Sequence, residues 1–277
     1  MLYAIRWGDG RGANVPYAFP TEPTPGVWMP TPPGFAAPVT PWMGQMVPFT
    51  MTSASQFLPG PPPSLSSREW VDDYNEVKAL GAVNSTVRTP GQTETGLFWT
   101  ENTAAQYARA LRNLAGAYGL DLAETARLFA LVWTSSADAL IGCWNAKFKY
   151  SFWRPVTAIR NGDIDGNPDT APDPNWTPLA TTPAHPEYPS AHGCFTGALA
   201  ESMRQYFKKA DFTFIVSSGV TNTVHEIHSV DELVQEVQNA RIYSGIHYRH
   251  SVVEGTNLGR QVAQQAFERF FTAESNR

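Results

Sequence analysis

Two histidines, three cations and a serine in this chain have the types and the spacing expected of a site that binds an oxyanion. They stand in three short segments: Lys147 with Arg154-Pro155, then Pro189-Ser190-Ala191-His192, then Arg241 with His247. Cationic side chains neutralise a tetrahedral anion, and hydroxyl and backbone N–H groups donate hydrogen bonds to it. The sequence therefore predicts that these segments converge on one pocket.

The middle segment predicts the start of a helix. Ser190 is a natural N-cap, and the free N–H groups of the first turn, including that of Ala191, would face outward beside it. Helix N-termini bind phosphate-like anions through these groups and the helix dipole. His192, in the first turn, would stand at the edge of such a site. Taken alone, the segment also permits a plain cap followed by a surface histidine.

The two flanking segments need particular backbone geometry to reach that site. Lys147 and Arg154 are seven residues apart, so a helix would place both on one face, although the proline after Arg154 favours a break there. Arg241 and His247 would lie on different faces of a continuous helix. A break at Ser244-Gly245 would let both side chains turn towards one point. Without such a site, these cations would be solvated side chains of amphipathic helices.

In order and spacing the segments read K-x6-R-P, P-S-x-H and R-x5-H, which resembles the signature of a known superfamily. That superfamily joins the vanadium-dependent haloperoxidases to the type 2 phosphatidic acid phosphatases and the bacterial class A acid phosphatases. The resemblance implies that His247 is bonded to vanadium or attacks phosphorus, and that His192 transfers a proton. It also implies that the oxyanion is bound by Lys147, Arg154, Ser190, the Ala191 N–H and Arg241.

Three positions refine the resemblance. Ala191 stands where the family usually has glycine, but it keeps the backbone N–H. Ser251 stands where the phosphatases carry an aspartate that orients the histidine, so we expect Glu254 or a backbone carbonyl to orient His247. His185 resembles a position held by histidine in bromoperoxidases and by phenylalanine in a chloroperoxidase, which implies a catalytic role for it.

The resemblance leaves two chemistries and one non-catalytic alternative open. In the first, the protein oxidises a halide, bromide rather than chloride, with hydrogen peroxide at a vanadate cofactor. In the second, it is an acid phosphatase that hydrolyses a phosphate ester through a phosphohistidine. In the third, it is a helical protein that binds an oxyanion without turnover. The missing aspartate after His247 and the presence of His185 favour the haloperoxidase, because a metal ligand needs less activation than a nucleophile.

The elements that must position these residues are mostly helices. Apolar periodicity predicts helices at about 67–81, 102–117, 121–147, 190–208, 229–244 and 247–271, a short strand at 212–216, and a long loop at 161–189. The first 65 residues contain 14 of the 23 prolines together with several aromatic residues, which is typical of an ordered coat. The predicted fold is an all-α helical bundle with long crossover loops. We expect a Pro-rich, mostly irregular wrap at 1–66 and a helical catalytic domain at 67–277, folded as one unit.

Composition restricts the partners. A net charge of −5 offers no broad basic surface, so nucleic acid is not an expected partner. No run approaches the ~20 apolar residues that span a bilayer, and Met1–Trp7 lacks the apolar core of a signal peptide, so we expect a soluble chain. Cys143 and Cys194 are expected to be buried free thiols. A homo-oligomer remains an open alternative.

Overall fold

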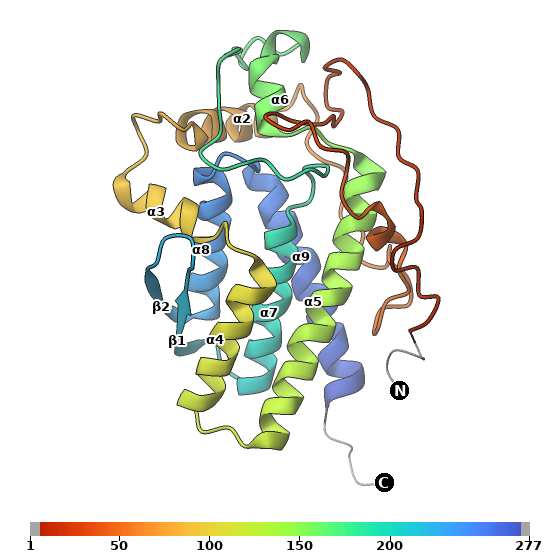
Figure 1. Cartoon of the computed structure of the whole chain (residues 1–277), viewed down its shortest axis with the longest axis vertical. Coiled ribbons are helices and arrows are strands. Elements are labelled where there is room, and N and C mark those ends of the chain that lie inside the picture. The colour runs from red at the N-terminus through yellow and green to blue at the C-terminus, as the bar shows by residue number, and fades with distance from the viewer. Residues whose placement is uncertain (1–5, 273–277) are drawn as a thin grey trace.

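The computed structural model describes residues 6–272, and these form the predicted helical bundle (Figure 1). Helix α7 (Ala191–Phe207) runs through the middle of the bundle and packs against α5 (Leu122–Tyr150), α8 (Val230–Tyr243) and α9 (Arg249–Ala266). Helix α4 (Thr103–Ala117) contributes Tyr107, Leu111 and Leu114 to the same core. The all-α prediction is therefore confirmed.

The remaining elements cover the two ends and one side of the bundle. Within residues 6–272 one hairpin pairs β1 (Asp211–Ser217) with β2 (Val224–Ser229) in antiparallel order, with Phe214 opposite Ile227. A π-helical turn follows α9 at Phe267–Phe271. The other bounds are η1 (Pro41–Gln45), α2 (Arg68–Gly81), α3 (Pro90–Phe98), α6 (Pro155–Arg160) and η2 (Gly162–Ile164).

Local capping signals begin the helices where the sequence indicated. The Asn102 side chain accepts a hydrogen bond from the Ala105 N–H at the start of α4. Asp121 and Glu124 form a reciprocal capping box at the start of α5. Such caps satisfy N–H groups that have no partner within the helix. In each cap the side chain and the N–H group that it binds are only three residues apart, so the sequence was sufficient to locate the helix start.

Helices α7 and α9 approach closely because glycines line their contact. A side chain at Gly259 would place its Cβ 2.1 Å from the Cys194 carbonyl oxygen, and one at Gly197 would place it 2.3 Å from that of Thr256. This contact fixes the start of α7 against the start of α9. It therefore determines how Ser190 and His247, which precede these two helices, lie relative to each other.

The Pro-rich segment before α2 is mostly irregular and runs along α5 (Figure 1). The carboxylate of Asp138, buried on α5, accepts the backbone N–H groups of Phe49, Thr50 and Met51 at 2.6–3.1 Å. It also accepts the Thr50 hydroxyl at 2.7 Å. One buried carboxylate thus attaches the segment to the bundle. The boundary at 66–67 remains a prediction.

Several features differ from the sequence prediction. Helix α5 ends at Tyr150, where Ser151 adopts a left-handed conformation with φ of 48°, and Arg154 immediately precedes α6. Lys147 and Arg154 therefore do not share one face of a continuous helix, and the break was the correct alternative. Helices α3 and α6 and strand β2 were not predicted, because each is short.

Two composition-based expectations can be compared with the structure. Cys143 and Cys194 are both free and buried, as expected. Among residues 6–272 no helix has the length and apolar character needed to cross a membrane. The expectation that Met1–Trp7 is not a signal peptide concerns a segment of which residues 1–5 lie outside the described residues.

Candidate oxyanion site

The carboxyl end of α5 brings a buried lysine to the site. Lys147 lies in the last turn of the helix, and its ammonium donates to the carbonyls of Pro186 and Glu187 at 2.8 and 2.9 Å. Burial lowers the pKa of Lys147 to about 8. These bonds hold the loop before α7 against α5, and the ammonium retains a third N–H to donate.

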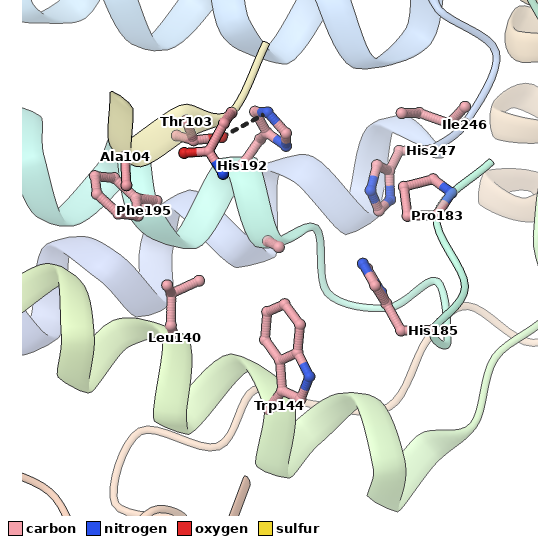
Figure 2. A pocket seen from close by; sticks show the side chains of 12 residues that line it. Thr103, Ala104, Leu140, Trp144, Pro183, His185, His192, Phe195, Ile246 and His247 are labelled. Carbon is pink, nitrogen blue, oxygen red and sulfur yellow. Dashed lines mark hydrogen bonds between the residues drawn. The ribbon is translucent and has the colours of Figure 1, made fainter. Parts of the chain in front are cut away.

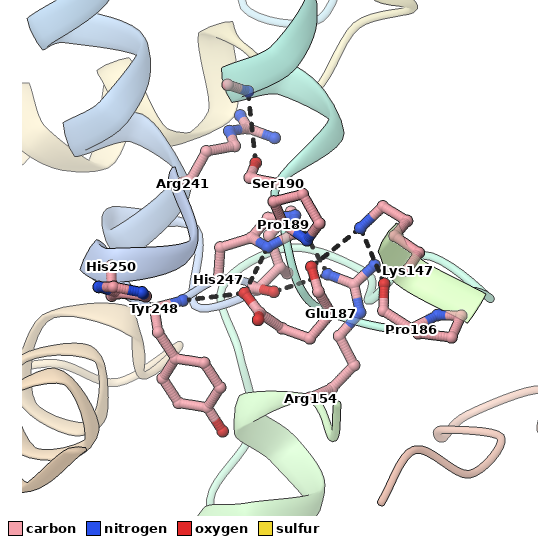
Figure 3. A network of polar contacts seen from close by, with 12 residues as sticks. Lys147, Arg154, Pro186, Glu187, Pro189, Ser190, Arg241, His247, Tyr248 and His250 are labelled. Carbon is pink, nitrogen blue, oxygen red and sulfur yellow. Dashed lines mark hydrogen bonds and ion pairs between the residues drawn. The ribbon is translucent and has the colours of Figure 1, made fainter. Parts of the chain in front are cut away.

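Arg154 connects the same loop to the turn before α9. Its guanidinium donates to the carbonyls of His185 and Ile246 at 3.0 and 2.8 Å. It also contacts two imidazoles, with His185 Nδ1 at 3.0 Å and His247 Nε2 at 3.2 Å. Figure 3 shows the contact between Arg154 and His247. A guanidinium can only donate, so His247 Nε2 accepts from Arg154. His185 Nδ1 also lies 3.1 Å from the Pro186 carbonyl, so this nitrogen stands between a donor and an acceptor. Burial lowers the pKa of Arg154 to about 10, so it stays charged at neutral pH.

His247 is oriented by Glu187, which the sequence did not identify. Its Nδ1 lies 2.6 Å from Glu187 Oε1, which also accepts the Tyr248 N–H at 3.2 Å (Figure 3). Since Nε2 accepts from Arg154, Nδ1 carries the proton and donates it to the carboxylate. The expectation that Glu254 or a backbone carbonyl would orient His247 is therefore wrong. The neutral ring therefore directs the lone pair of its Nε2 towards the Arg154 guanidinium.

Glu187 and His247 are both fully buried, which determines their charge states. Burial raises the pKa of Glu187 to about 7, although Arg154 and Lys147 act to lower it. Burial, followed by the charges of Arg154, Lys147 and Arg241, holds the pKa of His247 well below its ordinary value. The imidazole is thus a neutral donor of a lone pair at physiological pH.

The start of α7 has the geometry that the sequence predicted. The Ser190 hydroxyl accepts the Gly193 N–H at 3.4 Å, which leaves its own proton available to donate. Ala191 is the first residue of the helix, and His192 Nε2 lies 2.8 Å from the Thr103 hydroxyl of α4. Burial and then the charge of Arg241 hold the pKa of His192 well below its ordinary value.

Arg241 approaches from the last turn of α8. The helix ends at Tyr243, and Gly245 has φ of 77°, so the predicted break between Arg241 and His247 is present. The guanidinium donates to the Trp99 carbonyl at 2.6 Å, while its buried Nε has no partner within the described residues. Burial lowers the pKa of Arg241 to about 9. An unpaired donor of this kind is costly unless a ligand accepts it.

The three cations share an unusual electrostatic situation. Lys147, Arg154 and Arg241 are at most 1% exposed, and none forms an ion pair within residues 6–272. Buried charges in proteins are normally paired or bound to an ion. Glu187 is the carboxylate whose charge acts on the pKa values of Lys147 and Arg154, and its side chain is hydrogen-bonded to His247. The site therefore carries an excess of positive charge that a multivalent anion would neutralise.

A cavity of about 260 Å³ opens beside these groups (Figure 2). His185, Ala191, His192 and His247 line it, so the three histidines face one space. Asn102 and Thr103 also line it, and the other lining residues are apolar, namely Ala104, Leu140, Trp144, Pro183, Phe195 and Ile246. Lys147, Arg154, Ser190 and Arg241 are buried and are not among the residues that line this cavity. The structure thus connects the predicted residues through Arg154, which contacts both His185 and His247.

Comparison with known proteins places this arrangement in a family. A model described as the VCPO second helical-bundle domain matches residues 127–274, more than half of the chain. The chain is also 31% identical over 233 residues to the vanadium chloroperoxidase of Curvularia inaequalis. The chain belongs to the vanadium haloperoxidase family. That alignment covers 69% of this chain and 38% of the relative, so the chain spans about two fifths of the relative's length.

Solved vanadium haloperoxidase structures share the fold. A bacterial vanadium-dependent iodoperoxidase superposes with a TM-score of 0.76 and 27% identity, over 88% of this chain and 60% of that one. The holo form of a bacterial vanadium-dependent chloroperoxidase gives a TM-score of 0.72 with 17% identity, over 96% and 69% of the two chains. At the lower identity the likeness concerns the fold alone.

The signal that could have identified Glu187 was present but ambiguous. Glu187 lies within His185-Pro186-Glu187-Tyr188-Pro189, directly before the serine motif. Glu187 is the one acidic residue of this segment, and a buried carboxylate usually has a hydrogen-bond or ion-pair partner. The partner, however, lies 60 residues away, and the choice between Glu187 and Glu254 depended on the course of the loop.

Proposed function

We propose that this protein is a vanadium-dependent haloperoxidase that oxidises a halide with hydrogen peroxide, and bromide rather than chloride. One observation carries the proposal beyond family membership. Three buried cations form no ion pair within residues 6–272, and their charges lower the pKa of the neutral imidazole of His247, whose Nε2 lone pair faces one of them, Arg154. Such a site fits a multivalent oxyanion that also takes a nitrogen ligand.

The residues present fit vanadate. His247 Nε2 would be the nitrogen ligand, and Lys147, Arg154 and Arg241 would neutralise the oxygen atoms. Ser190 and the Ala191 N–H would donate further hydrogen bonds from the start of α7. When bound, vanadate supplies a Lewis-acidic centre at which hydrogen peroxide is activated towards a halide. The unpaired Nε of Arg241 supports this fit, because a bound oxyanion would give it an acceptor.

The protein side chains hold and move protons around that centre. Glu187 keeps the His247 proton on Nδ1, so Nε2, which accepts from Arg154, carries the lone pair that a ligand would take. His192 is neutral and lines the cavity, where it can accept a proton and return it. The apolar wall formed by Leu140, Trp144 and Phe195 limits competing water.

His185 supports the choice of bromide. It lines the cavity with His247, and its Nδ1 lies 3.0 Å from Arg154 and 3.1 Å from the Pro186 carbonyl. When Nδ1 accepts from Arg154, the neutral ring carries its proton on Nε2. An N–H at this wall would donate to a halide or to peroxide, which a phenylalanine ring at the same position would not do. Burial, followed by the charges of Lys147 and Arg154, keeps the pKa of His185 well below its ordinary value.

One observation favours the phosphatase as a second candidate. A nucleophilic histidine needs a carboxylate to orient and activate it, and Glu187 provides one despite Ser251 in the place of the usual aspartate. The absence of that aspartate therefore no longer argues against phosphate ester hydrolysis. Family membership remains the reason to place the haloperoxidase first.

Two alanine variants test the proposed assignment of roles. His247→Ala should abolish vanadate binding together with peroxide turnover, because it removes the nitrogen ligand. His192→Ala should retain vanadate and lose activity by about 10²–10⁴-fold, as expected for a proton-transfer residue. Vanadate bound equally by wild type and His247→Ala would refute the assignment. Vanadate and phosphate binding without turnover of either kind would indicate a non-catalytic oxyanion-binding protein.

A further inference from the structure

Trp99 links the proposed site to a group of charged residues nearer the surface. It follows α3, is fully buried, and contacts α8 at two points. Its carbonyl accepts the Arg241 guanidinium at 2.6 Å, and its indole N–H donates to Glu236 Oε1 at 2.8 Å. Both partners belong to α8, so Trp99 connects the last turn of that helix to its middle.

Glu236 is itself held by a histidine between two carboxylates. His225, on β2, has Nδ1 2.6 Å from Glu236 Oε1 and Nε2 2.9 Å from Glu94 Oε2 of α3. The Phe98 ring stacks on the imidazole with a centroid distance of 3.7 Å. The His225 side chain is 16% exposed, so this chain of contacts runs from the molecular surface to Arg241.

The Trp99 carbonyl affects both Arg241 and His192. It is the one hydrogen-bond acceptor of Arg241 within residues 6–272, so its position fixes the direction of the guanidinium. Its interaction with the His192 ring also raises the pKa of His192, against the larger lowering effects of burial and Arg241. A shift of Trp99 would therefore misplace a vanadate-binding cation and the proton-transfer residue together.

We propose that Glu236 and His225 are positioning residues for the oxyanion site, and that they act through Trp99 on Arg241 and His192. This inference rests on the proposed function only in naming vanadate as the ligand. Of the four contacts that form the chain, only the one between the Trp99 carbonyl and Arg241 involves a residue of the family motif. His225 fitted no motif in the sequence.

The charge of His225 makes the arrangement sensitive to pH. Burial lowers the pKa of His225, but its hydrogen bonds and charge interactions with Glu236 of α8 and Glu94 of α3 outweigh this and raise it. These two carboxylates are the charged groups that face the ring, and Phe98 covers it. The stabilising contribution of the cation is present in full below the ordinary value near 6.5. It is lost as the pH rises through the raised value.

The test compares orthovanadate affinity in four variants. Trp99→Phe removes the indole N–H and keeps a smaller aromatic ring, and Glu236→Ala removes the acceptor. We expect each to weaken binding about tenfold, as is common for outer partners of ligand-binding groups. Glu236→Gln retains an acceptor and should recover most of the affinity. Glu226→Ala, an exposed carboxylate next to His225 on β2, is the matched control and should bind like wild type.

Two further measurements separate positioning from a general structural effect. The pH profile of vanadate affinity should lose one step in His225→Gln while its other steps remain. Crystal structures of Trp99→Phe and Glu236→Ala should show Arg241 displaced. Unchanged affinity, pH profile and Arg241 position would overturn the inference and leave the proposed function intact. If the wild type binds no vanadate, the proposed function fails, and the position of Arg241 in the variant crystals alone decides the inference.

Discussion

Adding a tetrahedral dianion should stabilise this protein strongly at neutral pH and much less at alkaline pH. Sulfate is a suitable probe because its charge does not change between pH 6 and 10. Burial lowers the pKa of Lys147 from 10.5 to about 8, which corresponds to about 3 kcal/mol of destabilisation at 1.36 kcal/mol per pH unit. Because the folded pKa is the lower one, this penalty is complete below pH 8 and is relieved as the pH rises towards 10.5.

The expected shift follows from ligand linkage. At a sulfate concentration 100 times the dissociation constant, binding stabilises the fold by about 2.7 kcal/mol, or about 5 °C in melting temperature for a chain of this length. At pH 9.5 Lys147, with a pKa of about 8, is mostly neutral, so the site has lost one of its three cations. The shift should then fall below half of its value at pH 7.

Differential scanning calorimetry at both pH values would measure this shift, with chloride at equal ionic strength to correct for salt. Sulfate also stabilises proteins by exclusion from their surface, so a matched pair of variants is needed. Lys147→Met should lose most of the shift, whereas Lys149→Met, exposed on the same helix, should keep it. Equal shifts at pH 7 and 9.5, or an unaltered shift in Lys147→Met, would show that the buried cations do not form an anion site.

Three further substitutions test particular contacts. Glu187→Gln should keep the fold but weaken vanadate binding about 10–100-fold, because His247 loses its anionic partner. Titration calorimetry measures this affinity, and a wild-type value would exclude a role of Glu187 in orienting His247. Asp138→Asn should destabilise the fold by about 2–3 kcal/mol in urea unfolding, since it loses charge-assisted bonds to three backbone N–H groups. Gly259→Ala should lower the free energy of unfolding by about 1–3 kcal/mol, because the added methyl group forces α7 and α9 apart. Gly116→Ala is the control: its Cβ would meet nothing within 4 Å, so it should be neutral or stabilising. Equal melting temperatures for these two variants would contradict the packing argument.

The sequence was informative wherever the structure depends on local chemistry. Ser190 caps α7 and Asn102 caps α4 because each side chain bonds an N–H three residues later. The break at Ser244-Gly245 was visible because glycine readily adopts positive φ. Lys147, Arg154 and Arg241 could be grouped by their spacing and by the family resemblance, and the structure buries all three.

The sequence was less informative where a contact joins distant segments. Glu187 meets His247 across 60 residues, and the pairing depends on a loop whose course no periodicity describes. The apolar periodicity of α3 is weak, although Thr89 and Gln92 form a capping box around Pro90 that was a readable signal. His225 gave no signal, because its role depends on carboxylates from two other elements.

Halide-dependent consumption of hydrogen peroxide tests the central claim most directly. One preparation, stripped of bound anions, would be assayed with bromide before and after addition of orthovanadate, alongside hydrolysis of a phosphate monoester. The haloperoxidase proposal predicts bromide-dependent peroxide consumption that appears with vanadate, is absent in His247→Ala, and is inhibited competitively by phosphate. Rapid ester hydrolysis that vanadate inhibits, with no bromide-dependent peroxide consumption, would contradict the proposal and identify the site as that of a phosphatase.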